Sequence, residues 1–209
     1  PGVGKTTLIE IISSNTRSSL IKLNAVLSNI KELRTEIVNA KERLLSSNRK
    51  TILFIDEVHR FTSVQQDALL PSIENGTITF IGATTENPFF AVNKALISRA
   101  RIFSLLPLNK NDLRKIIDKV IKYYSCLQDS RVIEIKEEAI NHLIKFSGGD
   151  ARNLINALEL GISITKENKE NLVVIDLPIA EDSIQKKNIV YDKNGQNHFD
   201  VISAFIKSI

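Results

Sequence analysis

The chain has 209 residues, of which 43% are apolar and 25% charged, with a formal net charge of +4. This length suffices for one hydrophobic core with a small helical appendage, and so small a positive charge is weak evidence for an acidic partner. A membrane span, a disulfide framework and a zinc site are not expected. The chain has no apolar run of about 18 residues. It has one cysteine, Cys126, and three widely separated histidines. We therefore expect a cytoplasmic protein without a membrane partner.

The first half of the chain alternates between helical and strand patterns. Short apolar runs favour parallel strands that are covered on both faces, and apolar residues at helical spacing favour amphipathic helices. Thr62 and Gln65 form a capping-box pattern at the start of one helix. The predicted helices span about residues 5–14, 30–45 and 62–74, and the predicted strands span 20–26, 51–55, 77–83 and 102–105. This alternation predicts a doubly wound parallel α/β sheet.

The second half of the chain is predicted to be mostly helical. Asn109 has the chemistry of a helix N-cap, and helices are predicted at about 109–125, 136–146 and 150–165. Residues 166–196 are polar and look irregular, and a last amphipathic helix is expected to start at Phe199. The expected organisation is an α/β core at 1–108, a helical lid domain at 109–166, and a linker with the start of a further helical region at 167–209.

The chain opens with most of a phosphate-binding pattern, G-x-x-x-x-G-K-[ST], in the residues Pro1, Gly2, Val3, Gly4, Lys5, Thr6 and Thr7. Glycines let backbone N–H groups turn toward the phosphates, and the N-terminus of the following helix adds its positive dipole end. Lys5 would contact the β- and γ-phosphates, and Thr6 would ligate Mg²⁺. The expected cofactors are therefore ATP and Mg²⁺. The alternative, a plain glycine-rich turn before a helix, is disfavoured by the Gly-Lys-Thr-Thr order.

Two carboxylates follow the predicted strand at 51–55. Asp56 and Glu57 would lie at the carboxyl end of the sheet, where open α/β folds bind ligands. Asp56 would hold the Mg²⁺ shell and Glu57 would polarise the attacking water. A solvated strand end explains the pair equally well in isolation, but the position about fifty residues after a phosphate loop favours catalysis. The next histidine completes the D-E-x-H box of certain helicases, although we predict a hydrogen-bonding loop residue at His59.

Four further residues are candidates for the same site. Thr84 and Thr85 end the predicted strand at 77–83, where hydroxyls could bond to the attacking water or the γ-phosphate; turn residues of this kind are also common. Arg99 lies at the end of a predicted short helix and could act as an arginine finger, although its spacing alone favours a surface arginine. Arg152 could close over the nucleotide from the lid, and Asp150 before it has the chemistry of an N-cap.

These elements, in this order and spacing, resemble an AAA+ ATPase of the clamp-loader branch. Longer stretches resemble the replication-associated recombination protein A family more specifically (RarA, also called MgsA, related to the eukaryotic Werner-helicase-interacting protein). The stretches that carry this resemblance include Asp-Glu-Val-His-Arg-Phe at 56–61 and the segments 65–67, 70–71, 76–88, 96–101 and 191–208. Together they extend over essentially the whole chain.

The resemblance implies a DNA-stimulated ATPase that acts in replication-fork maintenance, recombination and repair. It also implies forked, gapped or ended DNA and single-strand-binding protein as partners, a homotetramer, and a nucleoid-associated location in the cytoplasm. The implied roles are phosphate and metal binding by Lys5 and Thr6, the metal shell for Asp56, the water for Glu57, the first sensor for Thr85, the trans-acting finger for Arg99 and the second sensor for Arg152.

The chain also departs from the family pattern. Phe89 stands where the family often has a small residue, and Asn153 stands where a second arginine commonly follows Arg152, so no role is carried over to that neighbour. The resemblance implies that the first glycine of the loop and a central strand lie before Pro1. It further implies that a helical oligomerisation region starts near Phe199 and continues past Ile209. We therefore expect an ATPase module that is trimmed at both ends.

Other functions share parts of this pattern. A D-E-x-H helicase would need a later arginine-rich motif and a second recombinase-like domain, which residues 105–209 lack. Clamp-loader subunits and branch-migration motors share the core, but the resemblance at 59–61 and 86–88 favours the recombination family over them. A non-catalytic AAA+ scaffold subunit would typically have lost the loop lysine or the carboxylates, whereas Lys5, Asp56 and Glu57 are all present.

Overall fold

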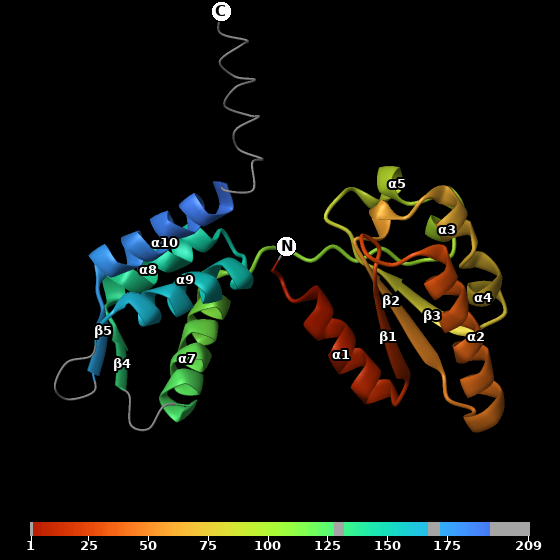
Figure 1. The fold of residues 1–209 in the computed structure, drawn as a ribbon, viewed down its shortest axis with the longest axis horizontal. Coiled ribbons are helices and arrows are strands. Elements are labelled where there is room, and N and C mark those ends of the chain that lie inside the picture. Colours follow the sequence, from red (N-terminus) through yellow and green to blue (C-terminus); the bar gives the residue numbers. More distant parts are fainter. Residues whose placement is uncertain (1, 128–131, 167–171, 193–209) are drawn as a thin grey trace, which may run out of the picture. The chain divides into compact units, whose positions relative to one another are not determined.

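A computed structural model describes residues 2–127, 132–166 and 172–192 of the chain. The chain forms two compact units, one of Gly4–Leu105 and one of Pro1–Val3 together with Leu106–Ile209 (Figure 1). We refer to them as the α/β unit and the helical unit. None of the helices in the described ranges combines the length and the apolar character that crossing a membrane requires.

The α/β unit is built on a parallel three-stranded sheet in the order β1-β2-β3. Its elements are α1 (Lys5–Thr16), β1 (Ser19–Asn24), α2 (Ile30–Ser47), β2 (Thr51–Asp56), the 3-10 turn η1 (Val58–Arg60), α3 (Ser63–Asp67), α4 (Leu70–Glu74), β3 (Ile78–Gly82), α5 (Pro88–Ala91) and α6 (Lys94–Ile97). In register, Ile55 of β2 lies between Leu23 of β1 and Gly82 of β3. The carboxyl ends of all three strands therefore meet at one edge of the sheet.

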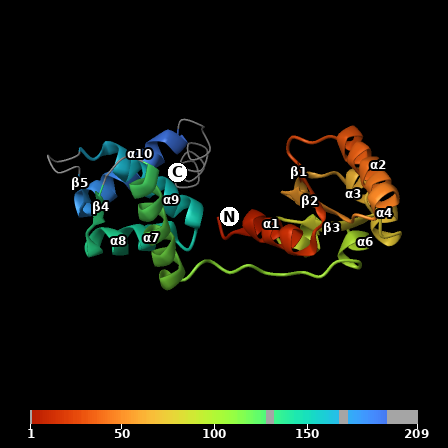
Figure 2. The ribbon, with the colours of Figure 1, turned by 90° about the horizontal axis from the view of Figure 1, so that it is seen from below.

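The central strand β2 is buried on both faces because its side chains alternate between two hydrophobic clusters. Leu53 and Ile55 pack with Leu33 of α2. Ile52 and Phe54 point to the opposite face and pack with Ile9 of α1. Figures 1 and 2 accordingly show α1 and α2 on different sides of the strands. This is the doubly wound arrangement that the alternating sequence predicts.

The region between β2 and β3 differs from the single helix predicted at 62–74. The capping box of Thr62 and Gln65 is present and starts α3 as expected. The helix then ends at Asp67, and α4 starts again at Leu70. Pro71 explains the break, because its ring nitrogen cannot donate to the carbonyl of Asp67 and its ring would clash with that carbonyl.

The strand predicted at 102–105 is wrong. Residues 101–109 form neither a helix nor a strand, and Ile102, Phe103 and Leu105 are 40%, 82% and 43% exposed. The run 102–105 has the apolar composition of a strand, yet within the described residues no strand pairs with it. An apolar run becomes a strand only where a neighbouring backbone supplies the hydrogen bonds.

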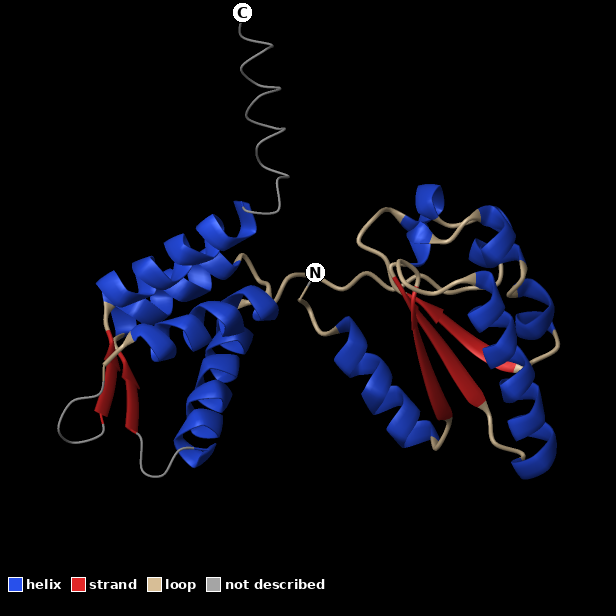
Figure 3. Cartoon of the chain, in the orientation of Figure 1, coloured by secondary structure: helices blue, strands red, loops and turns tan. Residues whose placement is uncertain are grey.

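The helical unit contains four helices and a small parallel sheet among the described residues (Figure 3). Its elements are α7 (Lys110–Leu127), β4 (Val132–Ile135), α8 (Glu137–Ser147), α9 (Ala151–Ile164), β5 (Leu172–Ile175) and α10 (Leu177–Asp192). The three predicted helices correspond to α7, α8 and α9. β4 was not predicted, and the prediction of irregular structure at 166–196 is wrong for β5 and α10. The helix expected from Phe199 lies outside the described residues.

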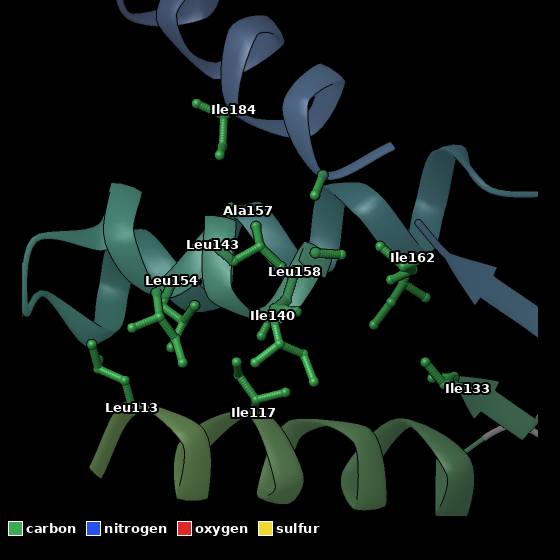
Figure 4. Packing of buried hydrophobic residues seen from close by; sticks show 14 of the residues in the cluster. Leu113, Ile117, Ile133, Ile140, Leu143, Leu154, Ala157, Leu158, Ile162 and Ile184 are labelled. Carbon is green, nitrogen blue, oxygen red and sulfur yellow. The ribbon is translucent and has the colours of Figure 1, made fainter. Parts of the chain in front are cut away.

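The core of the helical unit forms where α7, α8 and α9 meet (Figure 4). Ile117 of α7, Leu143 of α8 and Leu158 of α9 are almost completely buried there. Ile184 of α10 also belongs to this cluster, as does Ile133 of β4. The short strands β4 and β5 are therefore held by a core that helices dominate, which explains why so short a pair is stable.

A matched pair of leucines on α2 tests the packing of the α/β unit. Leu33 is fully buried against the sheet, whereas Leu45 on the same helix is 77% exposed. Leu33→Ala is expected to lower the free energy of unfolding by about 2–5 kcal/mol, because it leaves a cavity. Leu45→Ala should change it by no more than about 0.5 kcal/mol. Chemical denaturation followed by circular dichroism measures both, and equal losses would contradict the assigned face.

Candidate nucleotide-binding site

The glycine-rich loop runs directly into α1. Gly4 is the N-cap of the helix with a φ of 89°, and its carbonyl oxygen accepts a hydrogen bond of 2.9 Å from the Leu8 N–H. A φ in this left-handed range suits glycine. Lys5 is the first helical residue, and Thr6 follows it in the exposed first turn. The unpaired N–H groups of such a turn are a favourable environment for phosphate.

Position 2 is also restricted to glycine, because a side chain there would meet Asp150. Within the helical unit, the carbonyl oxygen of Gly2 accepts a 3.0 Å hydrogen bond from the Ala151 N–H. A Cβ atom at Gly2 would lie 1.8 Å from Oδ1 of Asp150. That carboxylate is occupied as the predicted N-cap of α9, since it accepts a 3.0 Å hydrogen bond from the Asn153 N–H. A side chain at position 2 would therefore displace the cap of α9.

Lys5 reaches the carboxyl edge of the sheet. Its Nζ atom donates to the carbonyl oxygen of Thr84, just beyond β3, at 3.5 Å. The lysine is half-buried, so its ammonium group is held beside the strand ends. A positive charge in this place would attract a phosphate group at the strand ends.

Asp56 and Glu57 occupy the same edge, at the end of β2. Glu57 adopts a left-handed conformation, with φ 53° and ψ 43°, which is uncommon for a residue with a side chain and is typical of functional sites. Two backbone contacts hold the turn: the Glu57 N–H donates to Oδ1 of Asp56 at 3.1 Å, and the Val58 N–H donates to the carbonyl oxygen of Ala83 at 2.9 Å. Both residues therefore lie at the carboxyl end of the central strand, in a turn whose conformation is fixed by hydrogen bonds.

The loop after β3 contacts these carboxylates through side chains. Oγ1 of Thr85 donates to Oε2 of Glu57 at 3.4 Å. His59 lies in the 3-10 turn η1 with its Nδ1 atom 2.9 Å from Oγ1 of Thr84. The hydrogen-bonding role predicted for His59 is confirmed, although the residue lies in a turn of helix rather than in a loop. Both hydroxyls singled out in the sequence therefore lie beside the β2 end.

The chemistry of the site suits Mg²⁺. Thr6 and Asp56 offer a hydroxyl and a carboxylate, and Mg²⁺ prefers such hard oxygen ligands. Over the described ranges, no three histidine, cysteine or acidic side chains gather into a metal cage. A cage is not needed, because Mg²⁺ in phosphate sites is held by one or two protein ligands together with water and phosphate oxygens.

Arg99 lies on the α/β unit, directly after α6, and its guanidinium is tethered. It donates to the carbonyl oxygen of Ala95 at 2.9 Å and to Oγ of Ser98 at 3.1 Å. It also forms a 2.5 Å ion pair with Glu74 at the end of α4. The side chain is 40% exposed, so it lies at a surface while being held in one orientation.

Arg152 belongs to the helical unit. It lies in the first turn of α9, directly after the capped start of the helix, and it is exposed. The roles of Arg99 as a finger and of Arg152 as a second sensor remain predictions.

Two acidic residues at the site were missed by the sequence analysis. Oε1 of Glu86 lies 3.4 Å from Nε2 of His59, and Glu74 holds Arg99. Neither belongs to a motif by its spacing, because each contact joins segments that are well separated along the chain. The one available signal was the position of Glu86 directly after the Thr84-Thr85 pair.

Two family models match the chain. Residues 1–108 match the ATPase family associated with various cellular activities (AAA), and residues 129–209 match the AAA C-terminal domain. Solved structures with the same fold include the Thermotoga maritima RuvB Holliday junction branch migration motor, with a TM-score of 0.63 and 24% identity over 88% of this chain and 58% of that one. A mutant of the same RuvB matches with a TM-score of 0.68 at 23% identity over 90% and 60%.

Curated relatives match the chain along its whole length. Replication-associated recombination protein A is 41% identical in Haemophilus influenzae and 42% identical in Bacillus subtilis, over 46% and 48% of those proteins. The ATPase WRNIP1 of Dictyostelium discoideum is 39% identical over 25% of its length. The chain thus spans about half the length of the bacterial relatives it matches. It belongs to the AAA family of ATPases, and it is similar along its whole length to replication-associated recombination protein A and WRNIP1.

Proposed function

We propose that the full-length protein is a DNA-dependent ATPase of replication-fork maintenance, recombination and repair. The observation that carries the proposal is the gathering of Lys5, Glu57 and the Thr84-Thr85 pair at the carboxyl edge of one parallel sheet. A cation for phosphate, a carboxylate for water and hydroxyls between them are the parts that phosphoanhydride hydrolysis needs. A scaffold subunit that only binds partners would not need the Glu57 carboxylate in this place.

In this mechanism the chain binds and orients ATP. Backbone N–H groups of the 1–7 loop and the Lys5 ammonium hold the phosphates, and Thr6 and Asp56 hold Mg²⁺. When bound, Mg²⁺ neutralises charge on the phosphate oxygens. Glu57 accepts a hydrogen bond from the attacking water and orients its lone pair toward the γ-phosphorus. The reaction is then accelerated mainly by positioning and by charge stabilisation, as in other phosphoryl transfers.

Three residues respond to the γ-phosphate in this proposal. Thr85, whose hydroxyl is already hydrogen-bonded to Glu57, acts as the first sensor. Arg152 acts as the second sensor from the lid domain at 109–166. Arg99 acts in trans, on nucleotide held by the neighbouring subunit, because an exposed guanidinium at a surface is available to a second copy of the chain.

The remaining assignments concern the whole protein. We propose forked, gapped or ended DNA as the activator, single-strand-binding protein as a partner, and a homotetramer in the cytoplasm, near the nucleoid. The α/β core at 1–108 carries the chemistry, and a helical oligomerisation region begins within 167–209. The names of the relatives, which refer to replication and recombination, support this direction.

The activity of the full-length protein with and without DNA tests the function. ATP hydrolysis is expected to rise severalfold on forked or gapped DNA and to rise less on covalently closed circular duplex, which has no fork, gap or end. Glu57→Gln protein, purified in parallel, controls for contaminating ATPases. Hydrolysis that responds to no DNA structure would contradict the DNA dependence while leaving the ATPase assignment in place. A rate equal to that of the Glu57→Gln control would contradict the enzyme itself.

A further inference from the structure

His59 is a buried polar residue that faces charged groups. Its side chain is only 6% exposed, whereas the side chains of Glu57 and Glu86 on either side of it are 30% and 58% exposed. A buried imidazole stabilises a fold only when its nitrogens are satisfied by hydrogen bonds. At His59 the partners come from two separate segments, the turn after β2 and the loop after β3.

Both ring nitrogens are used. Nδ1 lies 2.9 Å from Oγ1 of Thr84 and 3.4 Å from Oε2 of Glu57. Nε2 lies 3.4 Å from Oε1 of Glu86. The Glu86 N–H in turn donates to Oγ1 of Thr84 at 3.0 Å. The ring therefore forms a bridge from the carboxylate of Glu57 to the 84–86 loop, and Glu86 fixes the orientation of the ring.

We propose that His59 is the positioning residue for Glu57, with Glu86 as the group that orients the imidazole. This inference rests on the proposed function, since it assigns Glu57 to the attacking water. It adds that the carboxylate of Glu57 is held by His59, two residues further along the chain, and by Thr85 in the loop after β3. His59 acts through Glu57 and has no contact with substrate in this assignment.

The Glu57 side chain needs contacts that fix its orientation because it lies in a partly exposed turn. The residue follows the end of β2 in a left-handed turn and its side chain is partly exposed, so the long side chain has free rotamers to lose. Among the described residues, Thr85 and His59 both contact the same oxygen, Oε2. A misplacement of about 1 Å at a reacting group costs roughly a hundredfold in rate, so two contacts to one oxygen define where the carboxylate points.

Two amide substitutions separate positioning from packing. In His59→Asn the side-chain amide replaces Nδ1 and still faces Glu57. In His59→Gln the amide replaces Nε2 and faces Glu86. We expect His59→Ala to lower kcat by about ten- to a hundredfold with little change in KM for ATP. Asparagine should restore more of kcat than glutamine does, whereas a role in packing alone would favour the longer glutamine or leave the two alike.

Steady-state kinetics of the full-length protein give kcat and KM, and thermal melting shows whether each variant folds. Arg60→Ala is the control, because Arg60 is the exposed neighbour of His59, and its kcat should stay at the starting value. Glu86→Gln should lower kcat by less than His59→Ala does, since the amide keeps the shape of the carboxylate that lies beside Nε2. A normal kcat in His59→Ala, or equal rates in the asparagine and glutamine variants, would overturn the inference.

A double substitution separates this inference from the proposed function. In single-turnover assays, adding His59→Ala to Glu57→Gln should cause no further loss, because the group that His59 positions is already inactive. An additional loss of similar size would show that His59 acts on something other than Glu57. If Glu57→Gln itself keeps hydrolysing ATP, the proposed mechanism fails; if it is inactive while His59→Ala is normal, only the role of His59 fails.

Discussion

Replacing Glu57 by glutamine is expected to keep ATP binding and nearly to abolish hydrolysis in the full-length protein. The amide has nearly the same shape as the carboxylate, so the turn after β2 and the contact with Thr85 can persist. It carries no negative charge to polarise water, and loss of such a group costs about a hundred- to ten-thousandfold in rate. Binding of a fluorescent ATP analogue and release of phosphate measure the two properties separately.

Lys5→Ala is the matched variant that tests ATP binding rather than activation of the water. It removes the ammonium that lies beside the carboxyl edge of the sheet, so binding of ATP should be lost together with hydrolysis. The two variants thus differ in binding and agree in turnover. Hydrolysis by Glu57→Gln at close to the starting rate would show that the water is activated by another group.

The α/β unit could be predicted from sequence because its signals are local. The central strand β2 is an apolar run that ends in polar residues, and α2 has its apolar residues at helical spacing. Even the capping box at Thr62 involves only four consecutive residues. Such patterns depend on the burial of a strand or helix face and not on which distant segment buries it.

The failures occur where a neighbour decides the outcome. The apolar run at 102–105 has the composition of a strand, and no strand within the described residues pairs with it. The prediction missed β4 and β5, which is the opposite error. Val132–Ile135 and Leu172–Ile175 are short and next to polar segments, yet they pair with each other across about forty residues. Pairing at that distance leaves no trace in the pattern of either segment.

The predictions for the site residues succeed and fail for the same reason. Motif spacing pointed to Lys5, Asp56 and Glu57, since a phosphate loop and the carboxylates after a buried strand recur at recognisable intervals. The contacts of Glu86 with His59 and of Glu74 with Arg99 could not be read from spacing. They depend on side-chain directions at the ends of separate elements, which the order of residues alone does not determine.

Arg99→Ala is expected to leave ATP binding almost unchanged and to lower hydrolysis roughly a thousandfold or more. A guanidinium supplied to a neighbour's nucleotide neutralises charge that develops only in the transition state, so its loss affects kcat and hardly affects binding. In the single chain the guanidinium is paired with Glu74, an exposed ion pair of the kind that contributes little to stability. That contact is weak enough for Arg99 to exchange it for phosphate oxygens in an assembled oligomer.

Mixing variants shows whether Arg99 acts in trans. Lys5→Ala subunits bind no ATP but still present Arg99, and Arg99→Ala subunits bind ATP but lack the finger. Mixed oligomers therefore contain some interfaces with an intact lysine on one side and an intact arginine on the other, and they should regain part of the activity. Arg101→Ala is the control and should be much milder, since Arg101 lies beyond α6 in the 101–109 segment, which is neither helix nor strand. Inactive mixtures in which mixed oligomers are shown to form would exclude action in trans, and an active Arg99→Ala protein would make Arg99 an ordinary surface residue whose main partner is Glu74.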